Sequence, residues 1–225
     1  MIYVIGGIKG GSGKTTVATN LAVALVQDGR DVLLVDADDQ ETATDFSAWR
    51  NERTQGSAGY TSVQLTGQAA RDELKRLSKK YEDVVIDTGG RDTTSQRAAL
   101  SVADVYLVPF NPRSFDVWTL EKVTRLIQEI QTINPELKAY AFLNRADPRG
   151  SDNEEAAEVL RDSGTVQFLD TPLGNRKAFS NAAAQGMSVL ELQPEDRKAN
   201  AEFQTLYNTV CKAKNNVTND VEVRS

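Results

Sequence analysis

A run of small residues with two lysines lies near the start of the chain. Residues 7–16 read GIKGGSGKTT, directly after the apolar run Ile2–Gly6 and directly before a helical pattern. Glycines can adopt positive φ, so consecutive backbone N–H groups turn inward and bind an anion, and a following helix N-terminus adds free N–H groups. The Lys14 ammonium would reach the β- and γ-phosphates of a nucleotide, and the Thr15 hydroxyl would bind Mg²⁺. The expected phosphate-loop residues are Lys9, Gly10, Gly11, Ser12, Gly13, Lys14, Thr15 and Thr16.

The loop departs from the strict phosphate-loop pattern at its start. Ile8 stands where the pattern has glycine, and a second lysine, Lys9, precedes the glycine pair. The ordinary anion-binding nest needs no lysine at that place, so the sequence indicates a variant loop. The Lys9 cation would lie near the phosphates of its own nucleotide or of one held by a neighbouring chain.

Carboxylates follow two of the expected strands. Asp36 and Asp38 come after the run Asp31–Val35, and their alternation places both on one side if the strand continues. Asp87 ends the apolar run Asp83–Ile86. A carboxylate beside a phosphate loop can bind Mg²⁺ or its waters, or orient the water that attacks the γ-phosphate. We expect Asp87 to bind Mg²⁺ through water. The competing interpretations are a polar turn for the first pair and a helix cap for Asp87.

The elements that must position these residues alternate along the chain. The predicted strands are Ile2–Gly6, Asp31–Val35, Ser62–Leu65, Asp83–Ile86, Val105–Pro109, Tyr140–Leu143 and Val166–Leu169. The predicted helices are Thr15–Gln27, Thr42–Asn51, Gln68–Lys79, Thr94–Ala103, Ser114–Thr132, Asp152–Asp162, Arg176–Gln185 and Arg197–Lys212. This alternation predicts a single doubly wound α/β domain of the P-loop NTPase type, with a mostly parallel sheet and helices on both faces. We place this domain at residues 1–214 and expect a polar, flexible tail at 215–225.

The composition of the chain excludes several kinds of catalytic and metal-binding site. The chain has 225 residues, a net charge of −6, no histidine and a single cysteine, Cys211. These counts exclude histidine-based triads, imidazole metal ligands and any multi-cysteine cluster within one chain. Carboxylates, lysines, backbone amides and bound metal must carry the chemistry. The acidic charge argues weakly against a dedicated nucleic-acid-binding protein, although a local basic patch remains compatible with it.

The segment Lys9–Thr16 resembles the deviant Walker A loop of the ParA/MinD family of dimerising ATPases. In that family the first lysine crosses the dimer interface and contacts the partner's nucleotide, so the resemblance gives Lys9 this role. The acidic segment VDADDQ resembles the family's second motif, usually Asp-x-Asp-Pro-Gln. That likeness implies that Asp38 positions the attacking water and that Asp36 supports the metal and the loop. Asp39 stands where the family usually has proline.

Later segments of the chain resemble the segments of the family that bind adenine. Asn144 lies in a segment like the one whose asparagine reads adenine, and Pro172 lies where the adenine-side loop falls. The resemblance also implies DNA binding, and the candidate residues stand at the starts of two predicted helices: Arg176, Lys177, Arg197 and Lys198. Dimerisation could align these cations into one basic stripe, but they could also be solvated helix termini. Lys212–Ser225 lacks a basic amphipathic helix of the MinD kind, so we expect no membrane partner.

The resemblance is closest to the small plasmid-partition ParA proteins, including the ParF group. It implies an ATPase with ATP and Mg²⁺ as cofactors, which forms an ATP-dependent homodimer and binds non-specific DNA. A centromere-binding or cargo adaptor protein would stimulate the otherwise slow hydrolysis and release the dimer. The expected location is cytoplasmic and nucleoid-associated.

A positioning ATPase for another cargo, such as a carboxysome, a conjugation complex or a secretion complex, shares every motif and remains the alternative. A reductase of the same superfamily would need bridging cysteines, and a synthetase would leave Lys9 unexplained.

Overall fold

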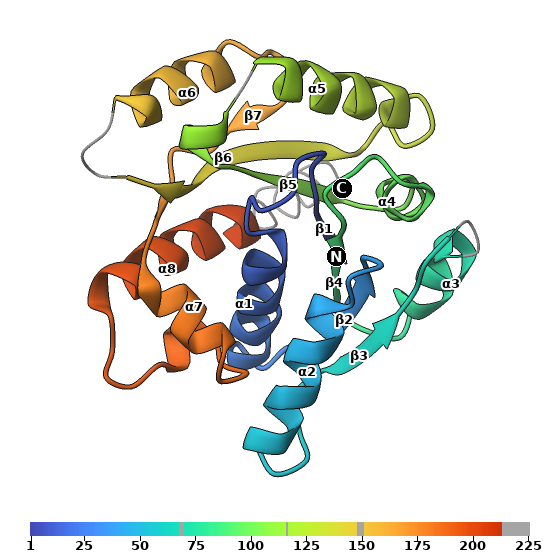
Figure 1. Ribbon diagram of the computed structural model, residues 1–225. Helices are drawn as coiled ribbons and strands as arrows, with labels where there is room; N and C mark the ends of the chain where they lie inside the picture. The colour runs from blue at the N-terminus through green and yellow to red at the C-terminus, as the bar shows by residue number, and fades with distance from the viewer. Residues whose placement is uncertain (68–69, 116, 148–150, 213–225) are drawn as a thin grey trace, which may run out of the picture.

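The computed structural model describes residues 1–67, 70–115, 117–147 and 151–212 (Figure 1). Its strands are β1 (Ile2–Ile5), β2 (Val32–Ala37), β3 (Thr61–Gln64), β4 (Asp83–Thr88), β5 (Val105–Phe110), β6 (Lys138–Ala146), β7 (Gln167–Phe168) and β8 (Leu173–Gly174). Its α-helices are α1 (Lys14–Gln27), α2 (Thr42–Arg53), α3 (Ala70–Leu77), α4 (Thr94–Leu100), α5 (Val117–Gln131), α6 (Asp152–Arg161), α7 (Lys177–Ala183) and α8 (Arg197–Lys212). The short 3-10 helices are η1 (Pro112–Ser114) and η2 (Val189–Glu191). The predicted tail at 215–225 lies outside the described residues.

The strands form one sheet in the order β3-β2-β4-β1-β5-β6-β7, with β8 paired to β6. Every described strand pair is parallel. From β1 the chain goes out to β2 and β3 on one side, returns to form β4 between β2 and β1, and then forms β5, β6 and β7 on the other side, which confirms the predicted doubly wound α/β fold. In such sheets ligands bind outside the carboxyl ends of the strands where the winding reverses, which here is the end of β1.

Two apolar cores cover the two faces of the sheet. Tyr3 and Ile5 of β1 pack on one side with α1, α7 and α8, while Val4 between them packs on the other side with α3, α4, α5 and α6 (Figure 1). This alternation follows from the period of two along a strand. Because both faces are covered, β2, β4 and β5 are buried along their whole lengths. That burial explains their continuous apolar runs.

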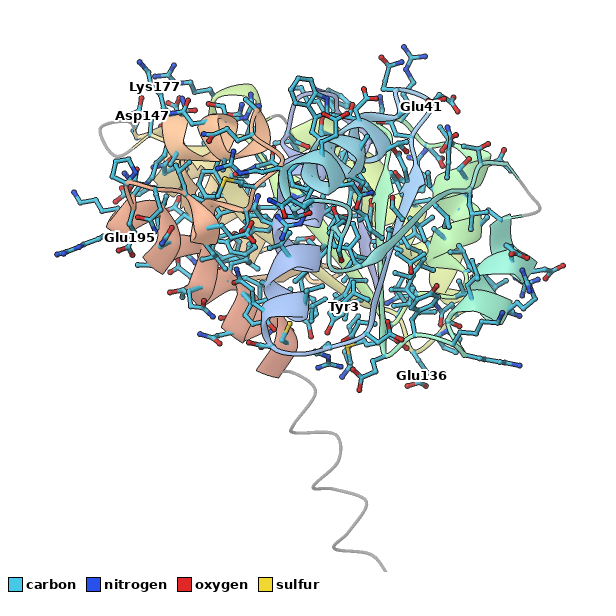
Figure 2. The ribbon with its side chains drawn as sticks, turned by 90° about the horizontal axis from the view of Figure 1, so that it is seen from below. Tyr3, Glu41, Glu136, Asp147, Lys177 and Glu195 are labelled. Carbon is cyan, nitrogen blue, oxygen red and sulfur yellow. The ribbon has the colours of Figure 1, made fainter. Side chains whose placement is uncertain are left out.

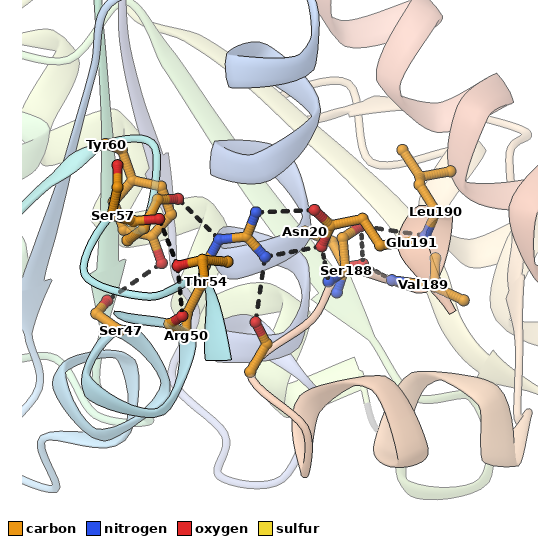
Figure 3. Close-up of polar contacts among 12 residues, drawn as sticks. Asn20, Ser47, Arg50, Thr54, Ser57, Tyr60, Ser188, Val189, Leu190 and Glu191 are labelled. Atoms are coloured by element: carbon orange, nitrogen blue, oxygen red, sulfur yellow. Dashed lines mark hydrogen bonds and ion pairs between the residues drawn. The ribbon is translucent and has the colours of Figure 1, made fainter. Parts of the chain in front are cut away.

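An ion pair between the buried Arg50 and the half-buried Glu191 joins α2 to η2 (Figure 3). The Arg50 guanidinium donates from its two terminal nitrogens to the Glu191 carboxylate, at 2.7 and 2.8 Å. It also donates to the carbonyl oxygens of Ala58 and Gly186, at 2.8 and 3.1 Å. The bidentate geometry and the added carbonyl contacts satisfy the buried cation. Arg50 therefore ties α2 and the loop after it to Gly186 and Glu191, which lie 136 and 141 positions further along the chain.

Asn20 links this network to the first helix (Figure 3). Its Oδ1 accepts hydrogen bonds from Ser188 Oγ at 2.8 Å and from the Val189 N–H at 2.7 Å. Its Nδ2 donates to the Thr16 carbonyl at 2.7 Å. The first turn of α1, which carries the end of the phosphate loop, is thereby fixed to the η2 segment.

We expect Arg50→Met to lower the free energy of unfolding by about 3 kcal/mol, because it leaves a half-buried carboxylate and two carbonyls without their donor. Burial raises the pKa of Glu191, but the hydrogen bonds from Arg50 and the Ser188 N–H outweigh it and lower that pKa below its usual value. The pair's contribution is therefore present at neutral pH and disappears as the carboxylate is protonated in acid. Chemical denaturation at several pH values measures this. The control Arg53→Met, at an exposed position of the same helix, should change stability by less than about 0.5 kcal/mol. Equal stability of the two variants would contradict the assignment.

Candidate nucleotide-binding site

The phosphate loop connects β1 to α1. Gly11 and Gly13 have φ of 75° and 87°, a region that residues with a Cβ rarely adopt. Gly13 is also the N-cap residue of α1, and no side chain caps the helix. The free N–H groups of the first helical turn are therefore available to an anion. Ile8 does not have a positive φ, and its side chain packs against the core on the α5 side of the sheet. This packing explains how isoleucine replaces glycine at the loop's start.

Lys14 is buried beneath the loop. Its side chain is 7% exposed, and its Nζ donates to the Lys9 carbonyl at 3.2 Å. Burial lowers the pKa of Lys14, while the carboxylates of Asp87 and Asp38 act in the opposite direction. A cation held in this way, beside carboxylates and inside a ring of backbone amides, is suited to bind a phosphate that enters the loop.

Asp87 at the end of β4 is fully buried, and neither carboxylate oxygen has a hydrogen-bond partner among the residues that the structure describes. Burial raises the pKa of Asp87 to about 7; the nearby Thr15 hydroxyl lowers it, and Asp36 raises it further. A bound divalent cation would supply the missing partner, and the oxygens of Asp87 and Thr15 are the donor type that Mg²⁺ prefers. Among the described residues, no group of three or more His, Cys, Asp or Glu side chains is placed so that it could hold a metal ion by itself. Water and phosphate oxygens would therefore complete the metal's coordination.

Asp36 and Asp38 have different surroundings. Asp36 is fully buried, and its oxygens accept hydrogen bonds from the Asp38 N–H at 3.1 Å, the Thr44 N–H at 2.8 Å and the Thr44 hydroxyl at 2.9 Å. It thus fixes the turn after β2 to the first turn of α2. Asp38 is half-buried, faces the cavity beside the loop, and accepts a hydrogen bond from the Gln40 N–H at 3.2 Å. Asp36 shapes the loop, whereas Asp38 is placed to meet a bound molecule.

The turn after β4 lies against the phosphate loop. A Cβ on Gly90 would come within 2.8 Å of the Gly10 backbone, and one on Gly89 within 3.0 Å of Asp38 Oδ1. Only glycine lets the two backbones approach this closely. The turn can therefore present its amides to the outermost phosphate of a nucleotide.

These parts surround an open cavity of about 740 Å³ at the carboxyl ends of the central strands. This volume suits a small-molecule ligand. The predicted residues that line it are Gly10, Gly11, Gly13, Lys14, Thr15, Thr16 and Asp38. Arg91 and Arg145 line it as well, and the sequence analysis assigned neither a role. Arg91 directly follows Gly89 and Gly90 in the sequence. An arginine in a turn does not by itself indicate a binding site, so the sequence could not show that Arg91 lines this cavity.

The predicted adenine contacts, Asn144 and Pro172, lie in different surroundings. Asn144 is buried, and its Nδ2 donates to the Ser12 carbonyl at 2.7 Å, so its amide is engaged by the phosphate loop. Pro172 is exposed in the segment between β7 and β8. Neither residue lines the cavity beside the loop. Their adenine contacts remain predictions.

Of the four predicted DNA-binding residues, one arginine forms an ion pair within the chain and the other three lie together on the surface. The Arg176 guanidinium pairs with Glu202 of α8, with its Nε at 2.8 Å from Oε2. Lys177, Arg197 and Lys198 line one shallow surface depression, which also contains acidic residues such as Glu195. Figure 2 shows Lys177 and Glu195 on the same flank of the molecule. The structure therefore gathers three of the four candidates, on a surface of mixed charge.

Residues 3–189 match the family described as the CobQ/CobB/MinD/ParA nucleotide binding domain. The chain belongs to this family. The match confirms the predicted ParA/MinD resemblance and spans the phosphate loop and the three carboxylates discussed above. No helix in the described parts of the chain is long and apolar enough to cross a lipid bilayer.

Similar proteins come from several systems. The maintenance of carboxysome distribution protein A of Gloeobacter kilaueensis is 34% identical over 208 residues, covering 91% of this chain and 90% of that protein. The protein of the same name in Halothiobacillus neapolitanus is 29% identical over 207 residues, covering 92% and 94%. A plasmid partition protein of Borrelia burgdorferi has a TM-score of 0.70 at 17% identity, covering 94% of this chain and 98% of that chain. The ATP complex of Cyanothece McdA(D38A) has a TM-score of 0.75 at 18% identity, covering 94% and 96%. The two structures confirm the fold of this ParA/MinD-family domain.

Proposed function

We propose that this ParA/MinD-family chain is an MgATP-dependent ATPase that positions a cargo. The observation that carries the proposal is that Lys14 and Asp38 line one cavity beside a glycine loop, with the buried Asp87 carboxylate close enough to act on Lys14. Lys14 and the loop amides bind the β- and γ-phosphates, and Thr15 and Asp87 hold Mg²⁺ with its waters. Bound Mg²⁺ would neutralise phosphate charge. Asp38 orients the water that attacks the γ-phosphate.

ATP controls pairing of two chains in this proposal. Lys9 contacts the nucleotide of the partner chain, so each chain completes the other's phosphate site. ATP then favours the dimer because the dimer binds it more tightly, and loss of the γ-phosphate removes that bias. The described residues offer little besides Asp38 to activate water. Hydrolysis is therefore slow until an adaptor protein binds.

The proposed track is DNA bound without sequence preference, which would place the protein at the nucleoid in the cytoplasm. Lys177, Arg197 and Lys198 contribute to this surface, together with the same residues of the second chain. The Arg176–Glu202 pair holds α7 against α8 and so positions the group. Two copies of the depression side by side would carry twice the cations, which explains how an acidic chain could bind a polyanion only as a dimer.

The relatives bear on the cargo. The two carboxysome-distribution proteins match over most of this chain and favour a large protein assembly as cargo, with an adaptor that recruits the dimer. A plasmid held by a centromere-binding protein is the second candidate, favoured by the ParA-type likenesses. The adjacent gene separates them: a small sequence-specific DNA-binding protein there favours plasmid partition.

The DNA-carrier proposal predicts a nucleotide-dependent mobility shift. Duplex DNA of random sequence should bind the protein in the presence of MgATP and far less in the presence of ADP, because only the ATP-bound dimer brings the two cationic surfaces together. The logarithm of the affinity should fall with that of the salt concentration, by about 0.9 per phosphate neutralised. Lys9→Ala should bind ATP but remain monomeric in light scattering and fail to shift DNA. Binding that ignores nucleotide, or no binding at low salt, would contradict DNA as the track.

A further inference from the structure

Arg145 has an unusual backbone at the edge of the nucleotide cavity. It is one of three non-glycine residues in the described chain with positive φ, at 58°, and the only one of them that lines the cavity. It lies in β6 where the pairing with β8 shifts register between Asn144 and Ala146. A side chain in left-handed backbone costs free energy, and such strain concentrates where a side chain must be aimed. Register irregularities in strands have the same effect on side-chain direction.

Asn144 holds Arg145 in this conformation. Its Oδ1 accepts a hydrogen bond from the Arg145 N–H at 3.0 Å, and its Nδ2 donates to the Ser12 carbonyl at 2.7 Å. One amide thus joins β6 to the phosphate loop. A Cβ on Gly13 would collide with Asn144 Nδ2 and would lie 4.0 Å from Arg145 Nε. The Arg145 side chain therefore passes beside the N-terminus of α1.

The Arg145 guanidinium is available to a ligand. The residue is exposed, and its side chain has no hydrogen bond or ion pair with any part of the chain that the structure describes. By contrast, Arg50, Arg97 and Arg176 are all paired with carboxylates. An unpaired guanidinium beside free helix N–H groups adds to an electrostatic site that already favours an anion.

The strand order places Arg145 on one flank of the loop. β2, which Asp38 follows, and β4, which contains Asp87, lie on one side of β1, and β6 lies on the other side beyond β5. The metal and the γ-phosphate belong to the carboxylate side. The rest of the bound nucleotide, from the β-phosphate to the nucleoside, must then extend past Gly13 and Thr16, where Arg145 lines the same cavity. The phosphate that reaches this flank is the one attached to the nucleoside.

We propose that Arg145 binds the α-phosphate of the nucleotide in its own chain, and that Asn144 is the residue that positions it. This inference rests on the proposed nucleotide-binding function. A guanidinium can bind two phosphate oxygens at once, which a lysine cannot do. Because ADP and ATP share the α-phosphate, Arg145 sets how tightly both are held and does not sense the γ-phosphate. In this proposal the Asn144 amide is engaged by the loop and by Arg145, which replaces the adenine contact that the family resemblance implied for it.

The test compares Arg145→Ala and Arg145→Gly with the wild-type protein, using isothermal calorimetry with MgADP and MgATP. Both variants should lose about tenfold in affinity for each nucleotide, in line with the loss of one charge-assisted contact. Arg145→Lys should recover part of the loss. The matched control is Arg125→Ala, which removes an exposed arginine of α5 outside the cavity and should bind both nucleotides like the wild type.

Arg145→Gly separates binding from folding. Glycine adopts positive φ without strain, so this variant should resist denaturant better than Arg145→Ala while binding nucleotide equally weakly. Wild-type ADP affinity in either variant would overturn the inference, as would a loss confined to ATP, which would place Arg145 at the γ-phosphate or at a partner's site. If the wild-type chain binds neither nucleotide, the proposed function falls and this inference with it.

Discussion

Replacing Lys14 with alanine is expected to lower the affinity for MgATP at least about a hundredfold, because the phosphates lose their buried cation. Hydrogen bonds to charged groups contribute about 1.5–3 kcal/mol each, and tenfold in affinity corresponds to about 1.4 kcal/mol. The carboxylates near Lys14 should increase this loss of affinity. Asp87 and Asp38 both act on Lys14, so the alanine variant leaves carboxylates facing incoming phosphate charge without compensation. Calorimetry with MgATP measures the effect.

Lys14→Met separates charge from shape at this position. Methionine keeps most of the side chain's length, so an equal loss in both variants assigns the effect to the ammonium. Lys75→Ala, at an exposed position of α3, controls for the general loss of one positive charge and should bind like the wild type. Near-normal binding by Lys14→Ala with an intact fold would refute the phosphate-loop assignment.

Local patterns predicted the architecture and the centre of the site. The glycines at Gly11 and Gly13 indicated positive φ, and the structure has it there. Buried parallel strands read as continuous apolar runs, so β2 and β4 could be located from sequence, together with the carboxylates that end them. The eight predicted helices correspond to α1–α8, with ends that differ by several residues in places. β8 was missed because a strand of two residues has no periodicity to detect.

Contacts between distant segments could not be predicted in this way. The bond from Asn144 to Ser12 joins residues 132 positions apart, and the Arg50–Glu191 pair joins residues 141 apart. Neither has a local signal, because each depends on where the sheet brings its partner. The same limit applies to Arg145, whose sequence neighbours do not show its positive φ. The family resemblance gave Asp36 and Asp38 different roles, but residue type and spacing alone could not, since their difference lies in the hydrogen bonds that Asp36 accepts from Thr44.

Asp38→Ala is expected to lower ATP hydrolysis at least about a hundredfold while leaving ATP affinity within a few-fold, as loss of a group that positions the attacking water should do. Asp38 is half-buried, lies at the cavity beside Gly89, and accepts only a backbone N–H bond within its own turn among the described residues. The phosphate contacts made by Lys14 and the loop do not depend on it. ATP should therefore bind, remain intact and hold the chain as a dimer, which light scattering and a phosphate-release assay can measure together.

The neighbouring carboxylates provide the discriminating comparison. Asp36→Ala removes the acceptor for Thr44 and for the Asp38 N–H, so it should weaken folding, nucleotide binding and hydrolysis together. Asp39→Ala removes an exposed carboxylate one residue along and should reduce hydrolysis less than tenfold, because no described hydrogen bond depends on its side chain. A dimer that persists with ATP only in Asp38→Ala would assign water positioning to that residue. Unchanged turnover in Asp38→Ala, or equal losses in Asp38→Ala and Asp39→Ala, would show that no single carboxylate of this turn positions the water.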